Sequence, residues 1–218
     1  MSYIEWNESY LLGYIKEQFG FPYNMFEIKD EDLLDKITNR YLREFSKYYP
    51  YKIACSLVYD SNNDYYIIDT DREIISVEKL LGLNYYLNNV KKQPRVDSIG
   101  SKDTYNDYVS FKYEPPNKIY IGQLTSGDLV ARVNTVHDKD LSTITPDKRN
   151  IFEELCVIEV AQWLLAIRSK YSEFSSPVGN LNLNTDFLRN IVDKKETFYN
   201  EKLIRPSIFS ERIPLMIG

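Results

Sequence analysis

The chain has almost none of the side chains that most catalytic and metal sites use. Its 218 residues contain one histidine and two cysteines. Zinc sites need several His or Cys ligands, and a catalytic His needs a nucleophile and an orienting partner. We therefore expect no catalytic residue, no cofactor and no metal site. We interpret His137 as an exposed loop residue after a strand, and Cys55 and Cys156 as small buried hydrophobes.

Long apolar runs and glycine motifs are absent as well. No run reaches the roughly 18 apolar residues that a membrane helix needs. The N-terminus carries acids where a secretory signal has basic residues. The eight glycines are scattered and match no phosphate-binding or dinucleotide fingerprint. We expect a soluble protein, made in a cytoplasm, with no membrane partner.

The charge balance is acidic, at −5 for the whole chain, and no long basic run occurs. Proteins whose main partner is nucleic acid usually present a basic face, so we expect no nucleic acid as the main partner. Hydrophobic residues make up 43% and charged residues 27% of the chain, which is ordinary globular usage. The composition therefore predicts a folded protein with a sizeable core.

Helical spacing of apolar residues predicts four helices, over residues 3–19, 30–49, 145–171 and 185–203. The third is the clearest, because Thr145 and Pro146 give a strong start signal. It is apolar on most sides, so we expect it to be packed on most sides as a central helix. Its acids Glu153, Glu154 and Glu159 are interpreted as part of a solvated helix start, where acids suit the helix dipole.

Strand character lies between the second and third helices. Segments rich in Ile, Val and Tyr, separated by polar turns, predict strands over residues 51–59, 64–69, 73–81, 118–122 and 129–136, with an extra strand at 108–113. We expect the first three to form an antiparallel meander and residues 84–117 to form an irregular loop. The predicted fold is α+β, a small antiparallel sheet packed with several helices in a single domain over residues 1–204, followed by an extended tail at 205–218.

One pattern allows an enzymatic alternative. Asp69 and Asp71 follow an apolar strand, and two carboxylates in such a place can hold a divalent cation. This alternative is a metal-dependent transferase or hydrolase. The competing interpretation is a polar turn between two strands, where Asp is a preferred residue.

Tyrosine is the unusual component. The chain has 19 tyrosines, and aromatic residues make up 14% of it. Tyrosine offers a large contact area with a polar tip and is enriched at protein interfaces. It also replaces Phe and Leu at half-buried strand positions. We predict interface residues at the tyrosine pairs and in the tail, namely Tyr48, Tyr49, Tyr65, Tyr66, Tyr85, Tyr86, Arg205 and Phe209.

Three stretches, in order along the chain, resemble structural proteins of large tailed bacteriophages, of the neck, head-to-tail connector or baseplate type. The first is residues 28–37 (IKDEDLLDKI), leading to residues 43–50 (REFSKYYP), an acidic cap and helix followed by F-S-x-Y-x-P. The second is the strand pair around residues 67–70 and 74–80. The third is residues 163–170, followed by the segment 179–188 and a final helix.

The resemblance implies a non-catalytic structural protein of the virion, assembled in the host cytoplasm. It implies a place in the neck or connector region and many copies around a symmetric axis. The expected partners are other virion proteins and copies of the same chain, arranged in a ring or wedge.

Overall fold

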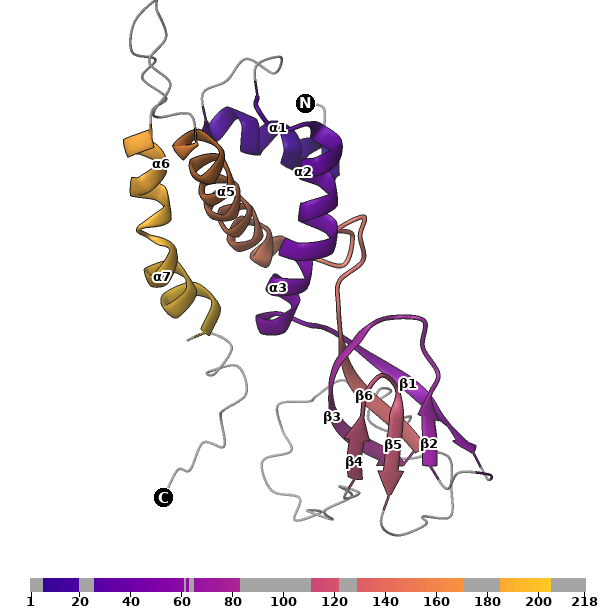
Figure 1. Cartoon of the computed structure of the whole chain (residues 1–218). Coiled ribbons are helices and arrows are strands. Elements are labelled where there is room, and N and C mark those ends of the chain that lie inside the picture. The colour runs from indigo at the N-terminus through magenta and orange to yellow at the C-terminus, as the bar shows by residue number, and fades with distance from the viewer. Residues whose placement is uncertain are drawn as a thin grey trace, which may run out of the picture. The chain divides into compact units, whose positions relative to one another are not determined.

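The computed structural model describes residues 6–19, 26–60, 62, 65–82, 111–121, 129–170 and 185–204. The chain divides into two compact units (Figure 1). The helical unit comprises Met1–Tyr49 and His137–Gly218, and the sheet unit comprises Pro50–Val136. The sheet unit is thus an insertion in the sequence of the helical unit. The single domain over residues 1–204 stays a prediction.

The first half of the helical unit consists of α1 (Glu8–Gln18), α2 (Asp30–Lys36), η1 (Ile37–Tyr41) and α3 (Leu42–Tyr48). The Asn7 side chain caps α1 by accepting a hydrogen bond from the Tyr10 backbone nitrogen at 3.0 Å. The segments α2, η1 and α3 form one continuous helix, as the sequence predicts, with a π-helical turn at η1. At that turn the Thr38 hydroxyl donates to the Leu34 carbonyl at 2.9 Å, which offers the backbone an alternative to the regular helical pattern.

The second half consists of α5 (Pro146–Ser169), α6 (Thr185–Val192), α7 (Lys195–Phe198) and the π-helical turn η2 (Tyr199–Ile204). Helix α5 lies between the α6–α7 segment and the N-terminal helices, in contact with α1, α3 and α6 (Figure 1). Its fully buried Phe152, Leu155 and Leu164 share one core with Leu11 and Phe45. The prediction of a central helix packed on most sides is confirmed.

The sheet unit is a six-stranded antiparallel sheet in the order β3-β6-β1-β2-β5-β4. The strands are β1 (Tyr51–Asp60), β2 (Tyr65–Ile68), β3 (Ile74–Gly82), β4 (Phe111–Glu114), β5 (Lys118–Ile121) and β6 (Leu129–Thr135). The two edge strands, β3 and β4, also approach each other, so the sheet curls toward closure. The predicted α+β fold class is confirmed.

The expected meander is wrong, because β3 pairs with β6 and not with β2. Strand length explains the difference. The ten residues of β1 pair with β6 through Tyr51–Ser56 and with β2 through Leu57–Asp60. The four residues of β2 could pair with less than half of the nine-residue β3, whereas the seven-residue β6 can pair with most of it. Within the expected loop at residues 84–117, β4 forms at Phe111–Glu114, overlapping the predicted extra strand.

Alternation along the strands separates the two faces of this sheet. One face supplies a small core of Cys55, Ile68, Leu80, Ile119, Ala131 and Val133. In β1 the positions between the core residues are exposed, from Lys52 through Ala54 and Ser56 to Val58. We call the side of the sheet that bears these residues its outer face.

Candidate protein–protein interface

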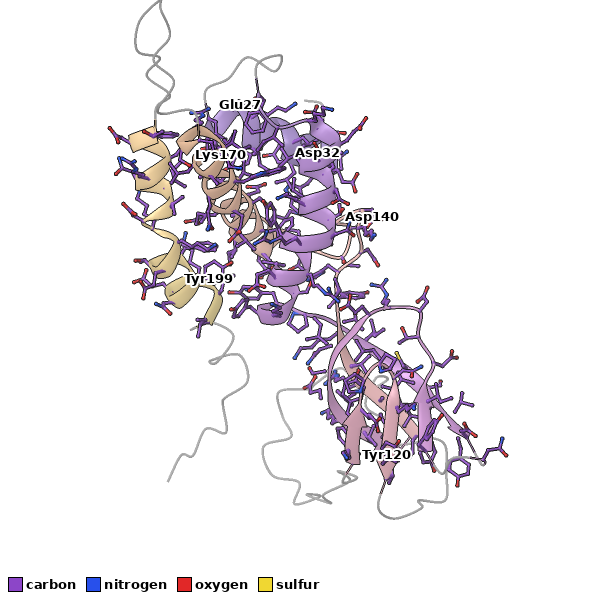
Figure 2. The ribbon with its side chains drawn as sticks, in the orientation of Figure 1. Glu27, Asp32, Tyr120, Asp140, Lys170 and Tyr199 are labelled. Atoms are coloured by element: carbon purple, nitrogen blue, oxygen red, sulfur yellow. The ribbon has the colours of Figure 1, made fainter. Side chains whose placement is uncertain are left out.

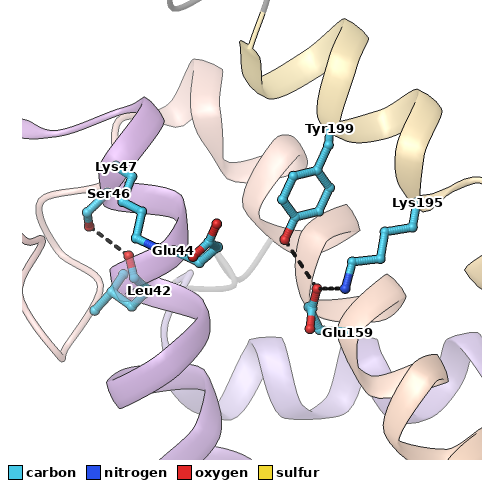
Figure 3. Close-up of polar contacts among 7 residues, drawn as sticks. All are labelled: Leu42, Glu44, Ser46, Lys47, Glu159, Lys195 and Tyr199. Carbon is cyan, nitrogen blue, oxygen red and sulfur yellow. Dashed lines mark hydrogen bonds and ion pairs between the residues drawn. The ribbon is translucent and has the colours of Figure 1, made fainter.

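Two carboxylates of α5, Glu153 and Glu159, are buried, so the expected solvated helix start is wrong for these two acids. Glu153 is 7% exposed and Glu159 is 8% exposed. The Trp6 indole donates to Glu153 at 2.7 Å. Glu159 pairs with Lys195 at 2.5 Å and accepts a hydrogen bond from the Tyr199 hydroxyl at 3.2 Å (Figure 3). Neighbouring segments pack over α5 and cover these two acids. The two acids in turn bind those segments to α5.

The histidine is buried, which corrects the expectation of an exposed loop residue. His137 is 8% exposed. Its Nε2 lies 2.8 Å from the Tyr49 carbonyl, and its Nδ1 lies 2.9 Å from the Thr143 hydroxyl. A carbonyl only accepts, so Nε2 carries a proton and donates it to the Tyr49 carbonyl. The His137 backbone nitrogen also donates to the Ser46 hydroxyl at 3.2 Å. These contacts give the His137 imidazole a structural role.

Both cysteines are buried free thiols, as predicted. Burial raises the pKa of the Cys55 thiol, and it raises that of Cys156 well above the ordinary value. The thiolate is the reactive form of cysteine, so both side chains are poor nucleophiles at neutral pH.

The Asp69 and Asp71 pair lies in the turn between β2 and β3. The Asp69 backbone nitrogen donates to the Ser56 carbonyl at 3.1 Å, and the Arg72 nitrogen donates to the Thr70 hydroxyl at 3.2 Å. This is the hydrogen-bonded polar turn of the competing interpretation. Across the described ranges, no group of three or more His, Cys, Asp or Glu side chains is placed to hold a metal ion.

No helix among the described residues is long and apolar enough to cross a bilayer.

The first predicted tyrosine pair packs within the helical unit. Tyr48 meets the Tyr199 ring edge-on, with centroids 6.2 Å apart. Tyr49 lies against Phe45 at 5.2 Å, and its hydroxyl donates to the Lys202 carbonyl. Burial, with a smaller effect of Asp147, raises the pKa of Tyr49. Both side chains are half-buried and hold α3 against its neighbours.

The second pair divides between the two faces of the sheet. Tyr66 packs against the sheet core and lies 5.0 Å from the Tyr59 ring. Tyr65 belongs to the outer face, where its ring meets that of Tyr120 at 5.8 Å. Figure 2 labels Tyr120 on β5 and Tyr199 at the end of α7. An interface role for Tyr48, Tyr49, Tyr65 and Tyr66 stays a prediction. Tyr85, Tyr86, Arg205 and Phe209 lie outside the described residues.

The sequence interpretation missed an apolar cluster on the outer face. It consists of Val58, Tyr65, Ile67 and Tyr120, and we call it the outer-face patch. Val58 lies directly opposite Ile67. Among the described residues, the large apolar side chains that are exposed are Val58 at 54%, Tyr59 at 43% and Phe187 at 41%. Alternation along each strand was visible in the sequence, but the partner strands and their register were not.

The comparison with known families identifies the chain's class. The model of a family described as bacteriophage ring protein, of the PBS1 type, matches residues 6–207 and so covers both units. No curated protein matches the chain.

The chain therefore belongs to the bacteriophage ring protein family, and it is a structural protein of a phage. The expected resemblance to phage structural proteins is confirmed at this level.

Proposed function

We propose that the protein is a subunit of a closed ring in the neck, or head-to-tail connector, of a tailed phage virion. It works through contacts with copies of itself and with other virion proteins, and it carries out no reaction. The observation that carries this proposal is the family match over residues 6–207, which spans both units.

The described surface supports an assembly role. A ring of more than two subunits needs two different contact surfaces on each copy. Exposed apolar side chains occur on the sheet unit at Val58 and Tyr59 and on the helical unit at Phe187. Tyrosine is a frequent hot-spot residue, and Tyr65 and Tyr120 stand on the outer face beside Val58. Among the predicted interface residues that the structure describes, Tyr65 therefore has the strongest structural support.

The first test is the assembly state of the purified chain. Light scattering coupled to size exclusion, followed by negative-stain electron microscopy, should show closed rings with one discrete subunit number. A chain that stays monomeric at every concentration, and binds no other virion protein, would contradict the proposal.

The second test locates the protein in the virion. Gold-labelled antibodies raised against the chain should decorate the junction between head and tail. Labelling at the baseplate would retain a ring but refute the neck assignment, and no labelling of intact or disrupted virions would refute a virion role.

A further inference from the structure

The outer-face patch is built from side chains that the core of the sheet does not use. Each of its members alternates along its strand with an inward residue. Val58 lies next to Leu57, and Ile67 lies next to the buried Ile68. Burying such a cluster removes apolar area from water, which favours association.

The patch also carries an ordered positive charge. The Lys118 ammonium lies 5.0 Å from the centre of the Tyr65 ring, in a cation–π arrangement. Glu114 lies directly opposite Lys118 on the neighbouring strand β4, and its hydrogen bond with the Tyr120 hydroxyl raises the pKa of that tyrosine. A partner that brings an apolar side chain and an acid side by side would therefore match the apolar side chains of the patch and its lysine.

Helix α6 presents that combination. Phe187 is 41% exposed, whereas the next residue, Leu188, is 1% exposed and packs into the helical core. The Asp186 side chain is 90% exposed, and it forms an exposed ion pair with Arg189 at 3.3 Å. An exposed ion pair of this kind is weak, so Asp186 can leave Arg189 and pair with another cation at little cost in free energy.

We propose that neighbouring copies in the ring contact each other through these two sites, with Phe187 of one copy seated on the outer-face patch of the next and Asp186 beside Lys118. This inference rests on the proposed ring function and names the contact that builds it. The two sites differ, so each copy offers one site to each neighbour. A head-to-tail contact of this type propagates around a ring.

Cross-linking between two different variants tests which surfaces meet. Ser56→Cys places a thiol on the outer face two residues before Val58, and Asn190→Cys places one on α6 a turn after Phe187. Both positions are exposed, and neither belongs to the proposed contact. A short bismaleimide should join the two variants when they are mixed, and it should join each variant alone far less. The unmodified chain is the background control, because Cys55 and Cys156 are buried.

Substitutions then test whether this contact holds the ring together. Val58→Asp should weaken assembly about tenfold or more, because it places a charged carboxylate in an apolar contact without a paired cation. Ala54→Asp is the matched control, because it adds the same charge to the same face of β1 about 13 Å away. Asp186→Lys and Lys118→Asp should each weaken assembly, and the double variant should regain most of it through the exchanged pair.

The outcomes separate this inference from the proposed function. Rings that tolerate Val58→Asp, show no cross-link between the two variants, or gain nothing from the charge exchange would overturn the α6-to-sheet contact and leave the ring intact. Cross-links within the Ser56→Cys sample alone would instead indicate sheet-to-sheet pairing and overturn the inference. An unmodified chain without any rings would overturn both.

Discussion

Two lysine–glutamate pairs hold the C-terminal segment on α5, and their different burial predicts different contributions to stability. Lys195 pairs with Glu159, and Lys202 pairs with Glu154, both at 2.5 Å. Each lysine also faces a neighbouring aromatic ring at a similar distance. The contrast is in exposure, because the Glu159 side chain is 9% exposed and that of Glu154 is 42% exposed. We expect Lys195→Met to be much the more damaging replacement.

The magnitude follows from what each replacement leaves behind. Removing one partner of a fully buried pair costs about 3–5 kcal/mol, because the remaining charge is uncompensated. The Lys195 side chain is 31% exposed, so water replaces part of its stabilising effect. The Tyr199 hydroxyl also still donates to Glu159. We therefore expect Lys195→Met to lower the free energy of unfolding by about 2 kcal/mol. An exposed pair contributes at most about 1 kcal/mol, which is the limit for Lys202→Met.

Thermal and urea unfolding, followed by circular dichroism at one assembly state, measure the difference. For a chain of this size, about 2 kcal/mol corresponds to a fall of about 4–8 °C in the unfolding midpoint. Adding Glu159→Met to Lys195→Met should recover most of the loss, since no buried charge then remains. Equal midpoint shifts for Lys195→Met and Lys202→Met, or no recovery in the double variant, would refute the reasoning.

Three further predictions concern titration, thiols and metals. Burial raises the pKa of Tyr41 above its ordinary 10.0, so the stability that this tyrosine contributes is complete below pH 10 and is lost as the pH rises beyond it. The unfolding free energy should therefore fall less steeply between pH 10 and pH 11.5 in Tyr41→Phe than in the unmodified chain, and parallel slopes would contradict this. Cys55 and Cys156 should react with a chromogenic disulfide reagent only upon unfolding, and rapid labelling of the folded chain would show that they are accessible. Calorimetric titration with Mn²⁺ should show no saturable binding that depends on Asp69, so the unmodified chain and Asp69→Ala should give the same heats. A saturable heat that is lost in Asp69→Ala would support the enzymatic alternative.

Local patterns predicted the elements of this fold well. Helical spacing located α5 and the continuous helix from Asp30 to Tyr48, because a stripe of apolar side chains is a property of neighbouring residues. Strand positions followed from composition in the same way. Strand pairing did not follow, since β3 pairs with β6, which begins at Leu129, far along the chain. The burial of His137 and Glu159 was missed for the same reason, because segments distant in sequence cover them.

The tyrosine content illustrates the same limit at the candidate interface. A high count suggests contact surfaces, but Tyr48 and Tyr49 pack within the helical unit and Tyr66 packs on the sheet core. Tyr65 differs from Tyr66 only in its parity along β2, and that one-residue difference places it on the outer face. A tyrosine pair in a strand therefore supplies one core residue and one surface residue. The strand register, more than the number of tyrosines, decides which of them is available to a neighbouring subunit.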